Sequence, residues 1–270
     1  GIGYSSTGDT VIIEIMFGDF ITLIADQLIN HCSKFSFLHS SSSPSIIVRT
    51  PIGGGRGYGA THSQSLEKIF GGIPNIHIEQ ISFMHSIHDC YERAMNRKGC
   101  TIISEPKLQY SHAYNKLDEF SNAVFEKEYI YDDDAEWLCL KSDVKDAISI
   151  VCTGITLPTV IKASKDLFLT YEISVNIISP RKTSPLFIPE KIKAYIATKC
   201  IVVDEAYDGY GFCETFIANF SVNSSKKVFF EKYCLEDNIY PSSLKLEEEF
   251  MINNDKLLSK IVELNEIHCP

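Results

Sequence analysis

The sequence predicts an α/β protein of two domains, each a mainly parallel sheet flanked by helices. Apolar runs alternate with amphipathic stretches twice along the chain, over residues 11–104 and again over 148–230. Strands that alternate with helices are typical of βαβ units and parallel sheets. A chain of 270 residues is long enough for two such domains. We expect residues 1–108 and 143–270 to form the domains, and 109–142 to link them.

Composition and charge exclude several classes of protein. The net charge of -10 argues against nucleic acid as a partner. No apolar run approaches the roughly 20 residues of a membrane-spanning helix, so we expect no membrane association. Nine scattered cysteines without a Cys-x-x-Cys pair predict reduced thiols, no zinc site and a cytoplasmic location, or the mitochondrial matrix or plastid in a eukaryote. Because the chain opens at Gly1 without Met, we expect a fragment or a processed product.

The first domain opens with a strand over 11–17, which is apolar enough to be covered on both faces. Gly18 then turns the chain, and Asp19 is a natural N-cap for a helix over 20–34. A polar loop follows at Ser40–Ser43. The other elements expected in this domain are strands 46–48, 76–81 and 101–104 and a helix over 85–97.

Residues 109–142 interrupt the alternation because they mix tyrosines with charged residues and an acidic patch. We expect a linker with at most one irregular strand. The second alternation predicts strands 148–153, 174–178, 200–204 and 227–230 and helices over 156–170, 189–197 and 211–220.

The stretch 49–70 gathers the residues that bear chemistry. Five glycines in residues 53–59, here called the glycine loop, let the backbone turn sharply and approach a ligand closely. Thr61 precedes Gln64 by three residues, which is the spacing of a capping box at a helix start. His62 would then lie in the first helical turn, where the helix dipole favours a neutral imidazole able to exchange protons near pH 7.

Other interpretations of the glycine loop stay open. Gly55-x-Gly57-x-x-Ala60 fits the dinucleotide-binding fingerprint, with Glu79 about twenty residues further on. No acidic residue clearly ends the next strand, however, and the loop can also be flexible and bind nothing.

Phe20 also has two interpretations. It belongs to an apolar helical stripe, which is typical of a core residue. It also lies just beyond the carboxyl end of a parallel strand, where open α/β sheets bind ligands. There its ring could stack on a heteroaromatic ring, and Phe20 and His62 could share one edge of a crevice.

Several segments carry a family resemblance. They are Glu14-Ile-Met-Phe-Gly-Asp-Phe20, Asp26-Gln-Leu-Ile-Asn-His31, Arg49-Thr-Pro-Ile-Gly-Gly-Gly-Arg-Gly-Tyr-Gly59, Thr61-His-Ser-Gln-Ser-Leu-Glu67, Ser104-Glu-Pro-Lys107, Asp204-Glu-Ala206, Gly209-Tyr-Gly-Phe-Cys-Glu214 and Tyr240-Pro-Ser-Ser243. Together they resemble the beta subunit of thiamine-diphosphate-dependent 2-oxoacid dehydrogenases, a group that includes the pyruvate, branched-chain and acetoin enzymes and is related to transketolase. The resemblance covers nearly the whole chain and implies a pyrimidine-binding domain followed by a transketolase C-terminal-like domain.

The resemblance also implies roles for single residues. Phe20 matches the aromatic residue that packs against the aminopyrimidine ring of thiamine diphosphate, and Gly18 and Met16 accompany it as cofactor-binding residues. His62 matches the histidine thought to handle protons during acyl transfer to a lipoyl arm, so we expect it to be the catalytic residue.

Three departures from the family pattern concern groups that bind or activate the cofactor. The glutamate that activates the cofactor is expected upstream of Gly1. The potassium loop of the family corresponds to Ala94–Gly99, where Arg97 replaces the usual Asp, so the potassium site is not carried over. The Gly-Asp-Gly…Asn motif that binds diphosphate is not in this sequence, so a partner would supply it together with magnesium, and we expect no metal ligands on this chain.

We therefore expect the beta-type half of a 2-oxoacid dehydrogenase. It would decarboxylate a 2-oxoacid and pass the acyl group to a lipoyl-bearing acyltransferase, in a heterotetramer with an alpha-type subunit. A transketolase-like or 1-deoxyxylulose-phosphate-synthase-like enzyme is the main rival. A catalytically idle scaffold subunit is a rival of another class. The sequence does not specify the 2-oxoacid.

Overall fold

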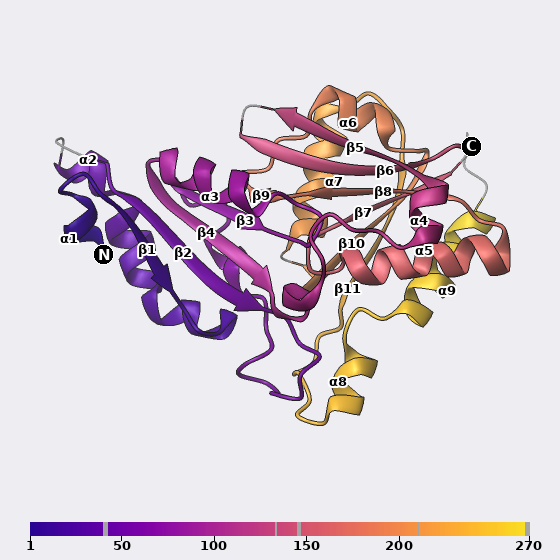
Figure 1. The fold of residues 1–270 in the computed structure, drawn as a ribbon, viewed down its shortest axis with the longest axis horizontal. Coiled ribbons are helices and arrows are strands. Elements are labelled where there is room, and N and C mark those ends of the chain that lie inside the picture. Colours follow the sequence, from indigo (N-terminus) through magenta and orange to yellow (C-terminus); the bar gives the residue numbers. More distant parts are fainter. Residues whose placement is uncertain (40–42, 133, 145–146, 210, 268–270) are drawn as a thin grey trace.

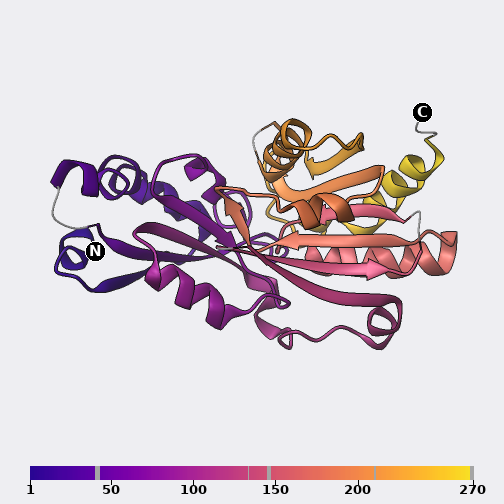
Figure 2. The same ribbon diagram turned by 90° about the horizontal axis from the view of Figure 1, so that it is seen from above.

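The computed structural model describes residues 1–39, 43–132, 134–144, 147–209 and 211–267, and these form two α/β domains side by side (Figures 1 and 2). Each domain contains one mainly parallel sheet with helices packed on it, so the predicted fold class is confirmed. Part of the predicted loop Ser40–Ser43 lies outside the described residues.

The first sheet has five strands in the order β1-β2-β4-β3-β9. They are β1 (Thr10–Glu14), β2 (Ser45–Ile52), β3 (Ile76–Gln80), β4 (Gly99–Pro106) and β9 (Lys182–Ser184). The first four run parallel, and β9 pairs antiparallel with β3. Every residue of β4 is buried, whereas β1 lies at the edge and leaves Ile12 52% exposed. The expectation that the first strand is covered on both faces is therefore wrong.

The helices of the first domain are short. They are α1 (Ile2–Ser5), the 3₁₀ helix η1 (Gly18–Ile24), the π-helix η2 (Gln27–Cys32), α2 (Phe35–His39), the 3₁₀ helix η3 (Glu67–Phe70), α3 (Ile87–Asn96) and the 3₁₀ helix η4 (Lys107–Ser111). The single α-helix expected over 20–34 is thus a 3₁₀ helix followed by a π-helix. Asp19 does not cap a helix, because its buried carboxylate accepts hydrogen bonds from N and Nε2 of Gln64 at 3.3 and 2.7 Å.

The second sheet has six strands in the order β11-β10-β7-β8-β6-β5. They are β5 (Phe125–Asp132), β6 (Ala135–Ser142), β7 (Ile148–Cys152), β8 (Val175–Pro180), β10 (Lys199–Tyr207) and β11 (Phe229–Leu235). The helices are α4 (Glu119–Val124), α5 (Leu157–Tyr171), α6 (Glu190–Tyr195), α7 (Phe212–Asn223), α8 (Leu244–Phe250) and α9 (Asn254–Glu266). Apolar side chains of α5 and α9 pack on one face of the sheet, and those of α6 and α7 pack on the other (Figure 1).

The region 109–142 is not the irregular linker that the sequence predicted. It contains α4 and the hairpin β5–β6, and β6 pairs with β8 from Trp137 opposite Pro180 to Leu140 opposite Ile177. Some of the charges and tyrosines that suggested a linker lie on the edge strand β5, where Tyr131 is 54% exposed. The division into units at 108 and 143 stays a prediction.

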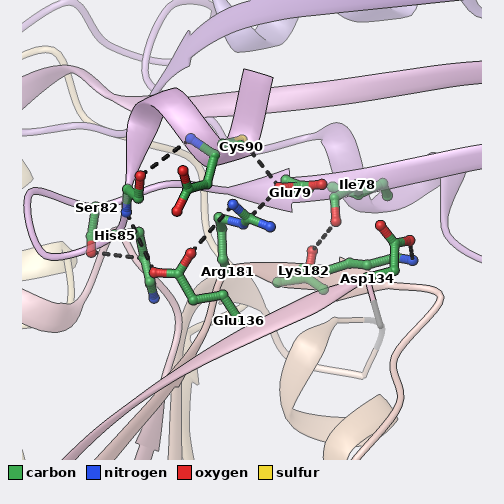
Figure 3. A network of polar contacts seen from close by, with 12 residues as sticks. Ile78, Glu79, Ser82, His85, Cys90, Asp134, Glu136, Arg181 and Lys182 are labelled. Carbon is green, nitrogen blue, oxygen red and sulfur yellow. Dashed lines mark hydrogen bonds and ion pairs between the residues drawn. The ribbon is translucent and has the colours of Figure 1, made fainter. Parts of the chain in front are cut away.

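A buried charge network joins the two domains (Figure 3). We give this name to Glu79, Arg97, Asp134, Glu136, Arg181 and Lys182. Arg181 Nε lies 2.9 Å from Glu79 Oε2 and its Nη1 lies 3.3 Å from Glu136 Oε2. Both Glu79 and Arg181 are fully buried, and β9 begins directly after Arg181. The network therefore holds the first sheet and the second sheet together at the point where the chain passes between them.

Two further expectations concern membranes and cysteines. Within the part of the chain that the structure describes, the helices are too short or too polar to cross a membrane. The eight cysteines of the described residues are free thiols, as the sequence predicted, and Cys269 lies outside those residues.

Candidate active site

An aromatic cluster lies beyond the carboxyl ends of β1 and β2. Phe17 and Phe20 follow β1, and Tyr58 and His62 follow β2, its parallel neighbour. The ring centroid of His62 lies 4.6 Å from that of Phe17 and 5.2 Å from that of Phe20, with interplanar angles of 88° and 70°. Phe17 and Tyr58 also meet edge to face at 6.0 Å. Phe20 and His62 therefore share one site, although this contact does not test their chemical roles.

His62 lies in a turn and not in a helix. The turn is closed by a hydrogen bond from its backbone N to the carbonyl of Gly59, and the next helix begins at Glu67. The amide of Gln64 donates to Asp19 and to the carbonyl of Ala60 and completes no capping box. The predicted helix start is therefore wrong, and the argument from a helix dipole does not apply to His62.

Arg56 stabilises the turn that contains His62, and the sequence did not predict this role. Its Nη2 donates to the carbonyls of Gly53 and His62 at 2.9 and 3.0 Å. The guanidinium also lies over two rings of the cluster, with Cζ 4.9 Å from the centroid of Tyr58 and 5.8 Å from that of Phe17. The side chain thus brings positive charge to the edge of the aromatic cluster.

Gly18 and Met16 occupy different surroundings. A Cβ atom at Gly18 would lie 2.8 Å from the carbonyl oxygen of Gln64, so packing inside the chain already requires glycine there. Met16 is 63% exposed beside the cluster. Gly18 lets the turn after β1 close against residue 64, whereas Met16 is accessible to a ligand or a partner.

The glycine loop packs against the second domain. The backbone N–H groups of Gly54 and Gly57 donate to the carboxylates of Glu205 and Glu247, respectively. A Cβ atom at Gly54 would lie 2.8 Å from Cε1 of Tyr240. The glycines therefore allow close approach of another domain, and the two carboxylates would repel a phosphate. This placement disfavours both a dinucleotide site and a freely flexible loop.

The buried carboxyl of Glu205 predicts a pH-dependent stability. Desolvation raises its pKa from 4.5 to about 7, although N of Gly54 and the hydroxyl of Tyr240 donate to its Oε1. Between these pH values the Glu205 carboxyl binds a proton in the folded protein but not in the unfolded chain. The stability that the protonated carboxyl contributes is therefore present at low pH and is lost as pH rises through 7.

Glu205→Gln keeps the acceptor and removes the charge. We expect it to raise the free energy of unfolding above pH 7 by up to about 3 kcal/mol relative to the unsubstituted protein, and to change it little near pH 4.5. Urea unfolding of both proteins at several pH values measures the difference. A difference that is the same at every pH would contradict this role of Glu205.

The position of the family's potassium loop does not fit a bound cation. Arg97 follows α3, and its guanidinium contacts the carboxylates of Glu79 and Asp134. The Lys182 ammonium also contacts Asp134. The three positive side chains of the charge network, counting Arg181, already contact its three carboxylates, so we assign no step to potassium.

Comparison with known proteins assigns the two domains. The family "Transketolase, pyrimidine binding domain" matches residues 1–112, and "Transketolase, C-terminal domain" matches residues 138–257. Each of these two parts of the chain belongs to the transketolase domain family that matches it. The aromatic cluster lies wholly in the pyrimidine-binding domain.

The relatives of this chain include several beta subunits. It is 26% identical to 2-oxoisovalerate dehydrogenase subunit beta of Bacillus subtilis over 98% of this chain and 80% of the relative. It is 25% identical to acetoin:2,6-dichlorophenolindophenol oxidoreductase subunit beta of the same organism, over 96% of this chain and 74% of the relative. It is 33% identical to pyruvate dehydrogenase E1 component subunit beta-3 of Arabidopsis thaliana chloroplasts, over 44% of this chain and 30% of the relative.

Solved structures support the same fold. A split-gene transketolase, described as an inactive beta4 tetramer, matches with a TM-score of 0.63 at 12% identity, over 97% of this chain and 78% of that one. Transketolase from Campylobacter jejuni matches with a TM-score of 0.64 at 14% identity, over 93% of this chain and 35% of that one. The resemblance found in the sequence motifs is thereby confirmed for the family and the fold.

Proposed function

We propose that this chain is the beta-type half of a thiamine-diphosphate-dependent 2-oxoacid dehydrogenase. The aromatic cluster in the pyrimidine-binding domain carries the proposal, and the names of the relatives support it. Thiamine diphosphate, when bound, supplies the carbanion-stabilising ring that lets a 2-oxoacid lose CO₂. We place the protein in the cytoplasm, or in the mitochondrial matrix or plastid of a eukaryote.

The residues of the cluster fit the pyrimidine end of this cofactor. Phe20 is partly buried, and its edge-to-face contacts with Phe17 and His62 hold its ring in one orientation. Heteroaromatic rings bind well against such a pre-oriented aromatic face. In the proposal Phe20 contacts the aminopyrimidine, Met16 lines the open side, and Gly18 lets the turn between them close.

The diphosphate end of the cofactor does not fit this chain. The N–H groups of Gly54 and Gly57 already donate to Glu205 and Glu247, so the glycine loop offers a diphosphate no donors at these positions. An alpha-type subunit would therefore supply the diphosphate and magnesium ligands, as the beta-subunit names of the relatives also suggest.

His62 is the proposed proton carrier. Its Nδ1 lies 2.9 Å from Oγ1 of Thr61, which leaves Nε2 to exchange a proton with a reacting group. Phe17 and Phe20 shield two sides of the imidazole from water. In the proposal His62 handles protons as the acyl group passes to a lipoyl-bearing acyltransferase.

A catalytically idle subunit is the second candidate. It is favoured because Arg97 replaces the Asp of the family's potassium loop and contacts Glu79 and Asp134 there. Activity of a complex with an alpha-type subunit separates the two candidates. A complex that binds thiamine diphosphate and leaves every 2-oxoacid unchanged would support the idle subunit. Turnover of ketose phosphates instead of 2-oxoacids would support a transketolase-like enzyme.

Phe20→Ala tests the cofactor contact. In a complex with an alpha-type subunit we expect thiamine diphosphate to bind about 2- to 13-fold more weakly, because an aromatic pair contributes about 0.5–1.5 kcal/mol beyond burial. Calorimetric titration measures the affinity. The control is Phe37→Ala, which removes an aromatic ring that is 87% exposed in the same domain. Unchanged affinity in a folded Phe20→Ala protein would show that Phe20 is a core residue only.

In the proposal the cofactor site is divided between this chain and an alpha-type subunit. This divided site predicts that this chain alone binds the cofactor poorly. We expect thiamine diphosphate with magnesium to bind residues 1–270 weakly or not at all, and binding to return with an alpha-type partner. We also expect self-association, because obligate interfaces commonly exceed about 2,000 Å² and leave apolar surface uncovered when separated. Calorimetry and mass determination in solution provide the measurements. Micromolar binding by a stable monomer would contradict the divided site.

A further inference from the structure

A cavity of about 300 Å³ lies between the two domains, at the carboxyl ends of β7 and β10. The chain leaves β7 for α5 and leaves β10 for α7, and these helices cover opposite faces of the second sheet (Figure 1). Neighbouring strands whose connections diverge in this way form a topological switch point, where open α/β sheets bind ligands. The aromatic cluster contributes no residue to this cavity.

Both domains contribute polar side chains to the cavity. Glu67 and Lys68 of η3 line it from the first domain. Thr153 after β7, Asp204 on β10 and Glu214 on α7 line it from the second domain. Its volume falls at the lower end of the roughly 300–1,000 Å³ that small-molecule sites occupy.

Among the described residues, two carboxylate oxygens at this cavity have no hydrogen-bond donor. Glu67 is only 5% exposed, its Oε1 accepts from Nε2 of Gln80 at 3.2 Å, and its Oε2 is buried with no partner in the described part of the chain. Glu214 Oε1 is 2.8 Å from Nζ of Lys232, and its Oε2 is likewise buried with no partner among those residues. Buried polar atoms are usually paired, so two unpaired acceptors beside one cavity point to a ligand that donates hydrogen bonds.

The charges at the cavity favour a cation over an anion. The N-terminus of α7, where an anion would bind, is already occupied by Asp204, whose Oδ2 accepts from N of Phe212 at 3.3 Å. Lys68 lies 3.7 Å from the same Asp204 oxygen and offsets one carboxylate. Glu67 then remains without a cation, and Glu214 shares the ammonium of Lys232 with Asp208. Burial raises the pKa of Glu67, and a bound cation would stabilise its ionised form.

A single metal ion does not match the spacing of these carboxylates. Among the described residues, the acidic, cysteine and histidine groups close enough to share one ion are His88 with Asp89 and Glu92, and Asp208 with Glu214 and Cys234. Glu67, Asp204 and Glu214 do not converge in this way. The Asp208 group already contacts the ammonium of Lys232. The ligand is therefore extended, with its donors placed apart.

We propose that this cavity binds a small aliphatic polyamine. One ammonium group would donate to the carboxylate of Glu67 and another to that of Glu214, with the hydrocarbon chain lying along Ile78 and Phe212. Such a site would couple the two domains, because Glu67 belongs to the first and Glu214 to the second.

Calorimetric titrations of the 270-residue chain at constant ionic strength test the proposal. The probes are 1,4-diaminobutane, spermidine, butylamine and magnesium chloride. We expect one saturable site for the two polyamines and weaker binding of butylamine. Glu67→Gln and Glu214→Gln should each weaken binding at least about tenfold, since each removes a charge-assisted hydrogen bond. The control Glu263→Gln removes an equal charge from an exposed position on α9 and should change the affinity less than about twofold.

Several results would overturn the proposal. Equal weakening in all three variants would show general attraction of polyamines to an acidic chain. Magnesium binding that depends on Glu67 and Glu214 would show a metal site instead, and absence of saturable polyamine binding would show no site. If Glu67→Gln fails to fold, a thermal shift decides: spermidine should raise the Tm of the unsubstituted protein and not that of Glu214→Gln. An equal rise in both proteins would also overturn it.

Discussion

Replacing His62 with alanine is expected to slow acyl transfer to a lipoyl domain by about 10²–10⁴-fold, the usual range for loss of a general acid–base group. The imidazole is held edge to face by Phe17 and Phe20, and its Nδ1 lies beside the hydroxyl of Thr61. We expect a smaller effect on decarboxylation followed with an artificial electron acceptor, since that assay bypasses the lipoyl arm. The two assays are compared in a complex with an alpha-type subunit.

The control for this experiment is His88→Ala, because His88 is 85% exposed and lies on α3, away from the aromatic cluster. It should leave both rates nearly unchanged. Equal losses in the two assays of His62→Ala would indicate that His62 positions the cofactor and does not carry protons in acyl transfer. Thiamine diphosphate affinity measured in parallel distinguishes these roles.

Arg181→Ala is expected to lower the free energy of unfolding by about 3–5 kcal/mol, the range for removal of one partner from a buried ion pair. Arg181 is fully buried between Glu79 and Glu136, so its loss leaves two buried carboxylates with less positive charge nearby. Urea unfolding measures the change. Trp137, the one tryptophan of the chain, is fully buried on the neighbouring strand β6 and provides the fluorescence signal.

Lys256→Ala is the matched control for Arg181→Ala. It also removes one cation from an ion pair, but Lys256 and Glu236 are 46% and 74% exposed, so we expect a loss of at most about 1 kcal/mol. A loss of similar size in the two variants would mean that burial adds nothing to the charge network. A large loss confined to Arg181→Ala would support its role in joining the domains.

The sequence predicted well those elements whose pattern is local. The helix expected over 156–170 is α5, Leu157–Tyr171, because its apolar residues repeat at helical spacing and pack on the second sheet. The strand expected over 46–48 extends to Ser45–Ile52 in the interior of the first sheet, between β1 and β4, where it is covered on both faces. The contact between Phe20 and His62 was also expected, since parallel strands bring their carboxyl ends together.

Other features depend on residues far apart in the sequence, which a local pattern does not reveal. The capping box predicted at Thr61 does not form, because the side-chain amide of Gln64 donates a hydrogen bond to Asp19. The glycine loop faces Tyr240 and Glu247, almost 200 residues later, so its glycines allow close contact between the domains. Arg56 was missed for a related reason, because its role consists in contacts with backbone carbonyls that a turn brings together.

The placement of β9 has a consequence for synthesis of the protein on the ribosome. Strand β3 ends at Gln80, but its antiparallel neighbour begins at Lys182, so this edge of the first sheet stays unpaired until roughly 100 further residues have been made. An unpaired strand edge is a template for pairing with other chains. Nascent or truncated chains that end before Lys182 should therefore aggregate through β3 or need chaperones, whereas chains that extend past β9 cover this edge themselves.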